Sequence, residues 1–220
     1  MSPWSTIARK ALMALTGLFL CIFLVVHLGG NLLLVLPPDE ARPLFNAYAE
    51  TLSGHPVIRG VAWVLYGALV AHVVDAAWIV ARNRRAAGAG PALDRRSEAS
   101  QWAGRHMGLL GLVLLVFLVA HLRDLWWAYT FGVVPLDPDG HRDLYAVVQA
   151  SFAPAWAVGL HLVAFGALGL HLWHGAFAAT QTLGLHHPTA RRVARVGGAL
   201  FSAAVTAGFS VVAVAVHLQS

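Results

Sequence analysis

Five long apolar runs dominate the sequence, and short charged or proline-containing stretches separate them. A bilayer core of about 30 Å is crossed by about 20 apolar residues in helical form. Lipid offers the backbone no hydrogen bonds, so runs of this length cross it as helices. We therefore expect an all-α integral membrane protein, a single five-transmembrane-helix bundle, with spans at about 11–36, 57–80, 106–131, 154–183 and 196–218. Gly184 and Pro188 are interpreted as stop signals for the fourth span.

The composition agrees with a membrane location and limits the redox chemistry. The chain has 58% hydrophobic and 11% charged residues, whereas soluble domains have about a quarter charged. The run that begins at Ala11 is too long for a cleaved signal peptide. The one cysteine, Cys21, excludes an internal disulfide, covalent haem c attachment and an iron–sulfur cluster held by this chain. Any redox centre is therefore bound mainly by histidine, of which there are 12.

The basic residues predict the orientation. Eleven of the 15 flank the starts of the first, third and fifth spans or the ends of the second and fourth: Arg9, Lys10, Arg82, Arg84, Arg85, Arg95, Arg96, Arg105, Arg191, Arg192 and Arg195. The positive-inside rule then places the N-terminus in the cytoplasm and the C-terminus outside. Because topology accounts for these charges, the net charge of +5 does not indicate nucleic-acid binding.

Histidines inside the spans are the candidate functional residues, because polar groups there are costly and usually face the bundle interior. At a rise of about 1.5 Å per residue, His27 and His121 lie about 25 Å from the cytoplasmic ends of their helices. His72 lies about 15 Å, His171 about 20 Å and His174 about 15 Å from those ends. Two levels result, each supplied by two helices, which is the arrangement for bis-histidine ligation of two haems. A zinc site would bring a third ligand and an acid, as in His-Glu-x-x-His, and no such motif occurs.

Several segments extend this interpretation. They are Thr16-Gly-Leu-Phe-Leu with His27-x-x-x-Asn31, Phe45-Asn-Ala-Tyr48, Ala71-His72, Ala120-His121-Leu, and Gly169-Leu-His171-Leu-Trp-His174-Gly175 with Gln181-Thr-Leu-Gly184 and His187-Pro188. Through these segments the protein resembles the cytochrome b subunit of succinate:quinone oxidoreductases, the succinate dehydrogenases and fumarate reductases, and the resemblance extends over nearly the whole chain. The form it resembles is the single anchor with five helices and two haems b.

The resemblance implies a ligand for each helix. His27 and His121 would bind the distal haem, and His72 and His171 the proximal haem. His171 is chosen because it begins the family's His-x-x-x-Gly pattern with Gly175, which lets the macrocycle approach the backbone; His174 is the alternative, slightly favoured by depth alone. Span two departs from the family, with Ala76 where relatives can have glycine. Its Asp75 would tune the haem, move protons or pair with Arg82.

The resemblance also implies the partners. A flavoprotein and an iron–sulfur subunit would dock on the cytoplasmic face, and this chain would pass electrons between them and a membrane quinone, menaquinone or ubiquinone. It would have no succinate chemistry alone, and would lie in a bacterial cytoplasmic membrane. Candidate quinone contacts near the outer end are Glu50, His55, Arg123, Asp124 and His161. The alternatives are a di-haem anchor of another dehydrogenase, such as a hydrogenase or formate dehydrogenase, and a haem-free transporter.

Overall fold

The computed structural model describes residues 6–86, 98–185 and 187–220, and these residues are almost entirely helical. Among these residues, five helical segments are long and apolar enough to cross a membrane, which confirms the predicted number of spans and the all-helical architecture. They are α1 (Thr6–Asn31), which continues as the 3-10 helix η1 (Leu32–Val35), α3 (Pro56–Ala86), α4 (Glu98–His121), α7 (Ala155–Thr182) and α8 (Pro188–Gln219). A π-helical turn, η2 (Leu122–Trp127), and a short helix, α5 (Ala128–Phe131), extend α4.

Several helices extend beyond the predicted spans: α1 begins at Thr6 and α4 at Glu98, each ahead of its apolar run. The second span continues to Ala86, because its arginines extend the helix beyond the apolar run. The last helix begins at Pro188, not near residue 196, so Pro188 starts α8 and does not stop α7. Proline has no amide hydrogen to lose at a helix start, and the His187 side chain caps this end by accepting from the Thr189 amide. Gly184 does end α7, with φ of +83°. Arg95 and Arg96 lie outside the described residues.

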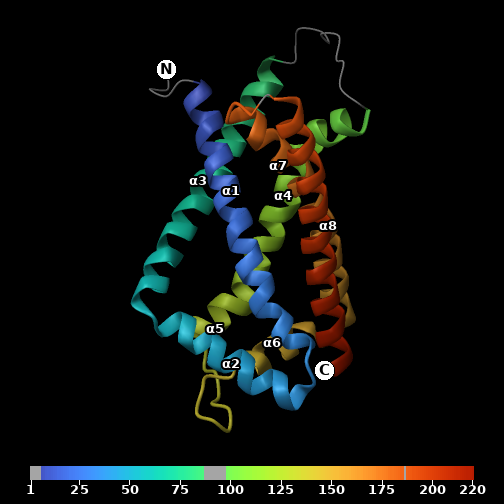
Figure 1. Cartoon of the computed structure of the whole chain (residues 1–220). Helices are drawn as coiled ribbons and strands as arrows, with labels where there is room; N and C mark the ends of the chain where they lie inside the picture. Colours follow the sequence, from blue (N-terminus) through green and yellow to red (C-terminus); the bar gives the residue numbers. More distant parts are fainter. Residues whose placement is uncertain (1–5, 87–97, 186) are drawn as a thin grey trace.

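The bundle has a densely packed half and a sparsely packed half. Helices α7 and α8 lie side by side, and α1 packs against α3 and α7 (Figure 1). A Cβ at Gly169 would meet the Thr206 hydroxyl at 2.5 Å, and the Ser202 hydroxyl donates to the Gly169 carbonyl at 2.6 Å. Of the residues in the most apolar stretch of each helix, 39% are buried in α7 and 33% in α8. In α3 and in α4 the buried share is 6%. Two of the five spanning helices therefore have few packing partners within the chain.

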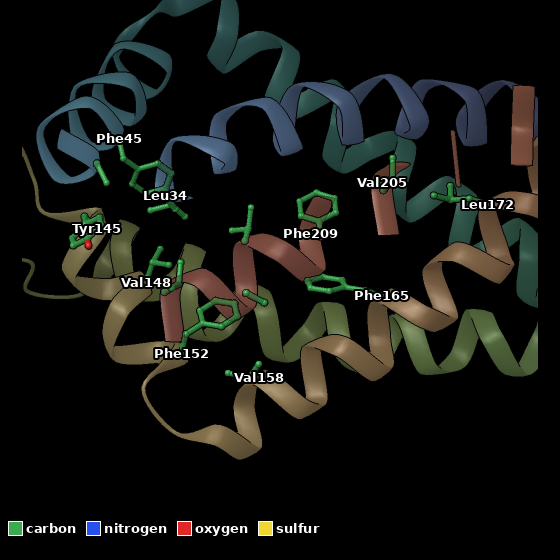
Figure 2. Close-up of a cluster of buried hydrophobic side chains, with 14 residues drawn as sticks. Leu34, Phe45, Tyr145, Val148, Phe152, Val158, Phe165, Leu172, Val205 and Phe209 are labelled. Carbon is green, nitrogen blue, oxygen red and sulfur yellow. The ribbon is translucent and has the colours of Figure 1, made fainter. Parts of the chain in front are cut away.

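Two short helices close one end of the bundle, and we expected only connections there. They are α2 (Pro38–Gly54) and α6 (Leu144–Phe152), which lie at the end where α8 finishes (Figure 1). The start of α2 has a recognisable signal, since Pro38 is followed by Asp39 and Glu40, which favour the positive end of a helix dipole. The main buried cluster runs from this end along α7 and α8 (Figure 2). Within it, Phe165 and Phe209 stack with ring centroids 5.4 Å apart.

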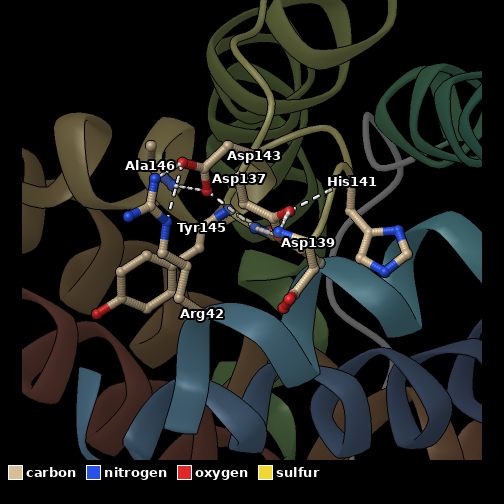
Figure 3. A network of polar contacts seen from close by, with 8 residues as sticks. Arg42, Asp137, Asp139, His141, Asp143, Tyr145 and Ala146 are labelled. Atoms are coloured by element: carbon tan, nitrogen blue, oxygen red, sulfur yellow. Dashed lines mark hydrogen bonds and ion pairs between the residues drawn. The ribbon is translucent and has the colours of Figure 1, made fainter. Parts of the chain in front are cut away.

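A polar network joins α2 to the loop before α6 (Figure 3). Asn46 is fully buried; its amide nitrogen donates to Asp137 and to Asp143, each at 2.9 Å, and its oxygen accepts from the Tyr145 amide. Asp143, also fully buried, pairs with Arg42 at 2.5 Å and caps α6 by accepting from the Ala146 amide. One asparagine thus satisfies two acids and an amide that would otherwise be buried unpaired. This network explains Asn46 in the segment Phe45-Asn-Ala-Tyr48.

We expect Asp143→Ala to lower the free energy of unfolding by about 2 kcal/mol, because it removes the partner of Arg42, one of the two acceptors of the Asn46 amide and the acceptor of the Ala146 N–H. Thermal unfolding in detergent, followed by helical circular dichroism, measures this loss. Asp139→Ala is the matched control, because Asp139 is an exposed acid in the same loop. Equal effects of the two substitutions would contradict the role given to the network.

The same network should be sensitive to acid. Burial alone raises the pKa of Asp143, but hydrogen bonds from Arg42, Asn46 and Ala146 outweigh it, so the pKa lies below the ordinary 3.8. The Asn46 amide likewise lowers the pKa of Asp137. Lowered pKa values give stability that is complete above an ordinary aspartate pKa of about 4 and is lost as the pH falls toward the folded values. The melting temperature should therefore fall below about pH 4, and fall less in Asp143→Ala than in the wild type.

Candidate functional site

Two of the predicted histidines meet at the level nearer the start of α1. His72 of α3 and His171 of α7 have ring centroids 6.4 Å apart, with the rings inclined by 66°. The Thr16 hydroxyl of α1 lies 3.1 Å from Nδ1 of His72. His174 lies one turn further along α7. The structure therefore places His171, the residue chosen from the family pattern, opposite His72.

The other two predicted histidines meet nearer the end closed by α2 and α6. His27 of α1 and His121, the last residue of α4, have ring centroids 6.0 Å apart and nearly perpendicular rings. Phe23 stacks on His27 at 5.1 Å, and Phe117 contacts His121 at 5.5 Å. Phe209 of α8 also contacts His27, with ring centroids 5.6 Å apart. The Asn31 side chain donates to the His27 carbonyl at 2.7 Å, at the point where α1 becomes η1.

The distance between the two ring centroids of each pair matches the distance expected for two imidazoles that bind one metal ion. A metal-bound imidazole nitrogen lies about 2 Å from the metal, so two rings on opposite sides of one iron have centroids about 6 Å apart. Within the described ranges, neither α1 and α4 nor α3 and α7 pack extensively against each other, so both pairs connect helices that are held apart. His161 and His171 mark the two levels on α7, which are about 15 Å apart along its axis.

The histidines satisfy a further condition for holding a haem. Nδ1 of His121 and Nδ1 of His171 are buried and have no hydrogen-bond partner. Buried polar atoms are normally paired, so such orphan atoms mark a place where a bound group completes the structure. A Cβ at Gly175 would meet nothing within 4 Å, so the backbone one turn from His171 is open to a large flat group. The residues present fit two bis-histidine haems, with His27 and His121 holding one and His72 and His171 the other.

A third imidazole, His161, lies beside the pair formed by His27 and His121. Its ring centroid is 6.2 Å from that of His121, a separation that would also suit a shared metal. However, α4 and α7, which carry these two residues, pack directly against each other and leave little room for a macrocycle. The ring of His161 is instead held by the Ala157 carbonyl, 2.8 Å from Nδ1, and by Phe152 and Phe165. His27 therefore remains the better partner of His121.

The remaining quinone candidates lie in different settings. Arg123 and Asp124 form an exposed ion pair with each other at 2.5 Å, within the π-helical turn η2. Glu50 bonds with His141, in the loop before α6, at 2.7 Å. Among the candidates with described partners, His161 is the one that lies against the paired histidines. The structure thus does not gather these residues into one site.

Asp75 lies one turn from His72 and is almost completely buried. Its carboxylate pairs with Arg9 of α1 at 3.0 Å, an ion pair between the first two spans that the sequence did not predict. The Arg9 guanidinium also lies over the Trp78 ring at 4.3 Å, and that of Arg82 lies 5.3 Å from the same ring. Arg82, the partner considered for Asp75, thus contributes to the same cluster through Trp78.

Two features near the histidines were missed. The chain turns into π-helix directly after His121, a local irregularity that often occurs at functional sites. No sequence signal marks it. Thr16 was noted only as part of a family segment, and its contact with His72 depends on how α1 and α3 pack.

If the pairing of Asp75 with Arg9 is structural, the two residues are coupled. Asp75→Asn or Arg9→Gln alone should cost roughly 2–4 kcal/mol, because each leaves a poorly hydrated charge unpaired. The double substitution should cost less than the sum, with a coupling energy of about 1 kcal/mol or more. Denaturant unfolding of the four proteins in detergent measures this coupling. Additive effects would show that the pair does not hold α1 to α3.

Comparisons with known proteins give no relative from which a role could be taken. No protein-family model, no curated protein and no solved structure matches this chain. The function is therefore argued from the two histidine pairs and their surroundings.

Proposed function

We propose that this chain is the di-haem cytochrome b anchor of a succinate:quinone oxidoreductase. The observation that supports it most directly is the presence of two imidazole pairs, at 6.0 and 6.4 Å, on two levels of one membrane-spanning bundle. A bound haem would supply reversible one-electron transfer, and two levels would connect the two faces of the membrane. The assignment to succinate chemistry depends on the resemblance of the sequence segments.

The residues around each pair would control the bound groups. Phe23, Phe117 and Phe209 surround His27 and His121 with apolar rings, which exclude water and lower the local dielectric. The pair of His72 and His171 has more polar neighbours, with Thr16 on the ring and the ion pair of Asp75 one turn away. Different surroundings give the two levels different reduction potentials.

The charged end of the bundle supports the proposed orientation. Exposed arginines lie at the end where α1 begins and α3 and α7 finish, among them Arg84, Arg85, Arg191 and Arg192. By the positive-inside rule this end faces the cytoplasm and the C-terminus lies outside. A flavoprotein and an iron–sulfur subunit would dock there, next to the level of His72 and His171. The protein would then lie in a bacterial cytoplasmic membrane.

The first test is spectroscopic. The purified chain should show a b-type α-band in its reduced-minus-oxidised spectrum and hold two haems. Alanine at His27, His72, His121 or His171 should each remove one haem, because a bis-histidine site cannot keep iron six-coordinate with one ligand. His174→Ala is the matched control on α7 and should keep both. Haem loss in His174→Ala but not in His171→Ala would show that His174 is the ligand on α7. Absence of the α-band in the wild type would refute the assignment as a cytochrome.

A second test addresses the partner. Affinity purification of the tagged chain from its native membrane should bring down a flavoprotein and an iron–sulfur protein, and the complex should reduce quinone with succinate as donor. Hydrogen and formate are the matched donors for the alternative dehydrogenases. Quinone reduction with formate or hydrogen, and none with succinate, would keep the cytochrome assignment and refute the succinate complex.

A further inference from the structure

The ring of His72 is held by a helix that supplies no ligand at its level. His72 belongs to α3, but its imidazole lies against α1 at Thr16 and Gly17. Nδ1 is 3.1 Å from the Thr16 hydroxyl oxygen, and a Cβ at Gly17 would lie 3.3 Å from Cε1 of the ring. Thr16 is itself buried. The threonine and the glycine together fix where the ring lies and leave space for it.

The direction of this hydrogen bond follows from the partners of Thr16. Its hydroxyl lies 2.8 Å from the Leu12 carbonyl and 3.2 Å from the Met13 carbonyl, and it has one proton to donate. That proton is directed at the backbone, so the oxygen accepts from His72. Nδ1 of His72 therefore has the hydrogen, and Nε2 has a free lone pair.

We propose that Thr16 is a positioning residue for the proximal haem, the one that His72 and His171 would bind. Thr16 holds His72 in the Nδ1–H tautomer, so that Nε2 is the nitrogen presented to the iron. This inference rests on the proposed function. Metal-binding histidines usually donate their second ring N–H to an acceptor that orients the ring and raises its basicity. Nδ1 of His121 and Nδ1 of His171 have no hydrogen-bond partner, so among these three histidines His72 is the one whose Nδ1 is held by a side chain.

The experiment is a redox titration of the purified chain with its two haems. A stronger donor ligand stabilises ferric iron, so Thr16→Val should raise one of the two midpoint potentials and leave the other unchanged. Thr16→Ser restores an acceptor and should restore the wild-type value. Thr182→Val is the matched control, because the Thr182 hydroxyl makes the same bond to the carbonyl four residues earlier, at the exposed end of α7. Selective loss of one haem in Thr16→Val, with both retained in Thr16→Ser, supports the proposal equally.

Other results of this titration would overturn the proposed role of Thr16. Unchanged potentials in Thr16→Val, or equal shifts in Thr16→Val and Thr16→Ser, would show that the hydroxyl does not act on the ligand, while the cytochrome assignment would stand. A wild-type chain without haem would instead refute the proposed function. In that case ¹⁵N chemical shifts of labelled histidine still test the hydrogen bond. His72 should be the Nδ1–H tautomer in the wild type, and an Nε2–H tautomer would exclude the role of Thr16.

Discussion

In a bilayer, the hydrophobic effect no longer drives helices together, so specific contacts between helices determine the structure. Close approach provides one kind of contact, as at Gly169, where α7 and α8 come near enough for Ser202 to bond with the backbone. Polar pairs provide the other, with Arg9 and Asp75 joining α1 to α3 near one end of the bundle. Each contact is local, and each determines how far apart two helices lie.

Further polar contacts join the helices at the end of the bundle where α8 finishes. At the end closed by α2 and α6, His217 of α8 bonds with the Phe152 carbonyl at 2.9 Å, and Gln219 donates to the Leu36 carbonyl. The Asn46 network ties α2 to α6 at the same end. Further in, α3 and α4 bury little surface within the chain. These two helices carry His72 and His121, one member of each pair.

The five spans were predictable because they follow from a single requirement, that a long apolar run in lipid be helical. Depth predicted which helices supply each level, since residues that lie at one level meet in the bundle interior, but the choice of His171 over His174 rested on the family pattern. The short helices α2 and α6, with 17 and 9 residues, do not form apolar runs long enough to cross a bilayer, so the criterion that finds the spans does not find them. The π-helical turn after His121 and the contact of Thr16 with His72 depend on the packing of particular helices, and no period or motif in the sequence encodes them.

The cost of burying ring nitrogens without partners favours a role for these histidines in binding a group over a role as mere contacts between helices. If the imidazoles served only to join helices, each would be expected to use its ring nitrogens in hydrogen bonds, as His217 does when its Nδ1 bonds with the Phe152 carbonyl. Nδ1 of His121 and of His171 has no partner, at a cost of about 1–3 kcal/mol for each buried polar atom. Leucine or phenylalanine at these positions would avoid that cost and would pack better against lipid and Phe117. A group that binds through the ring nitrogens repays the cost, because metal coordination contributes far more than one hydrogen bond.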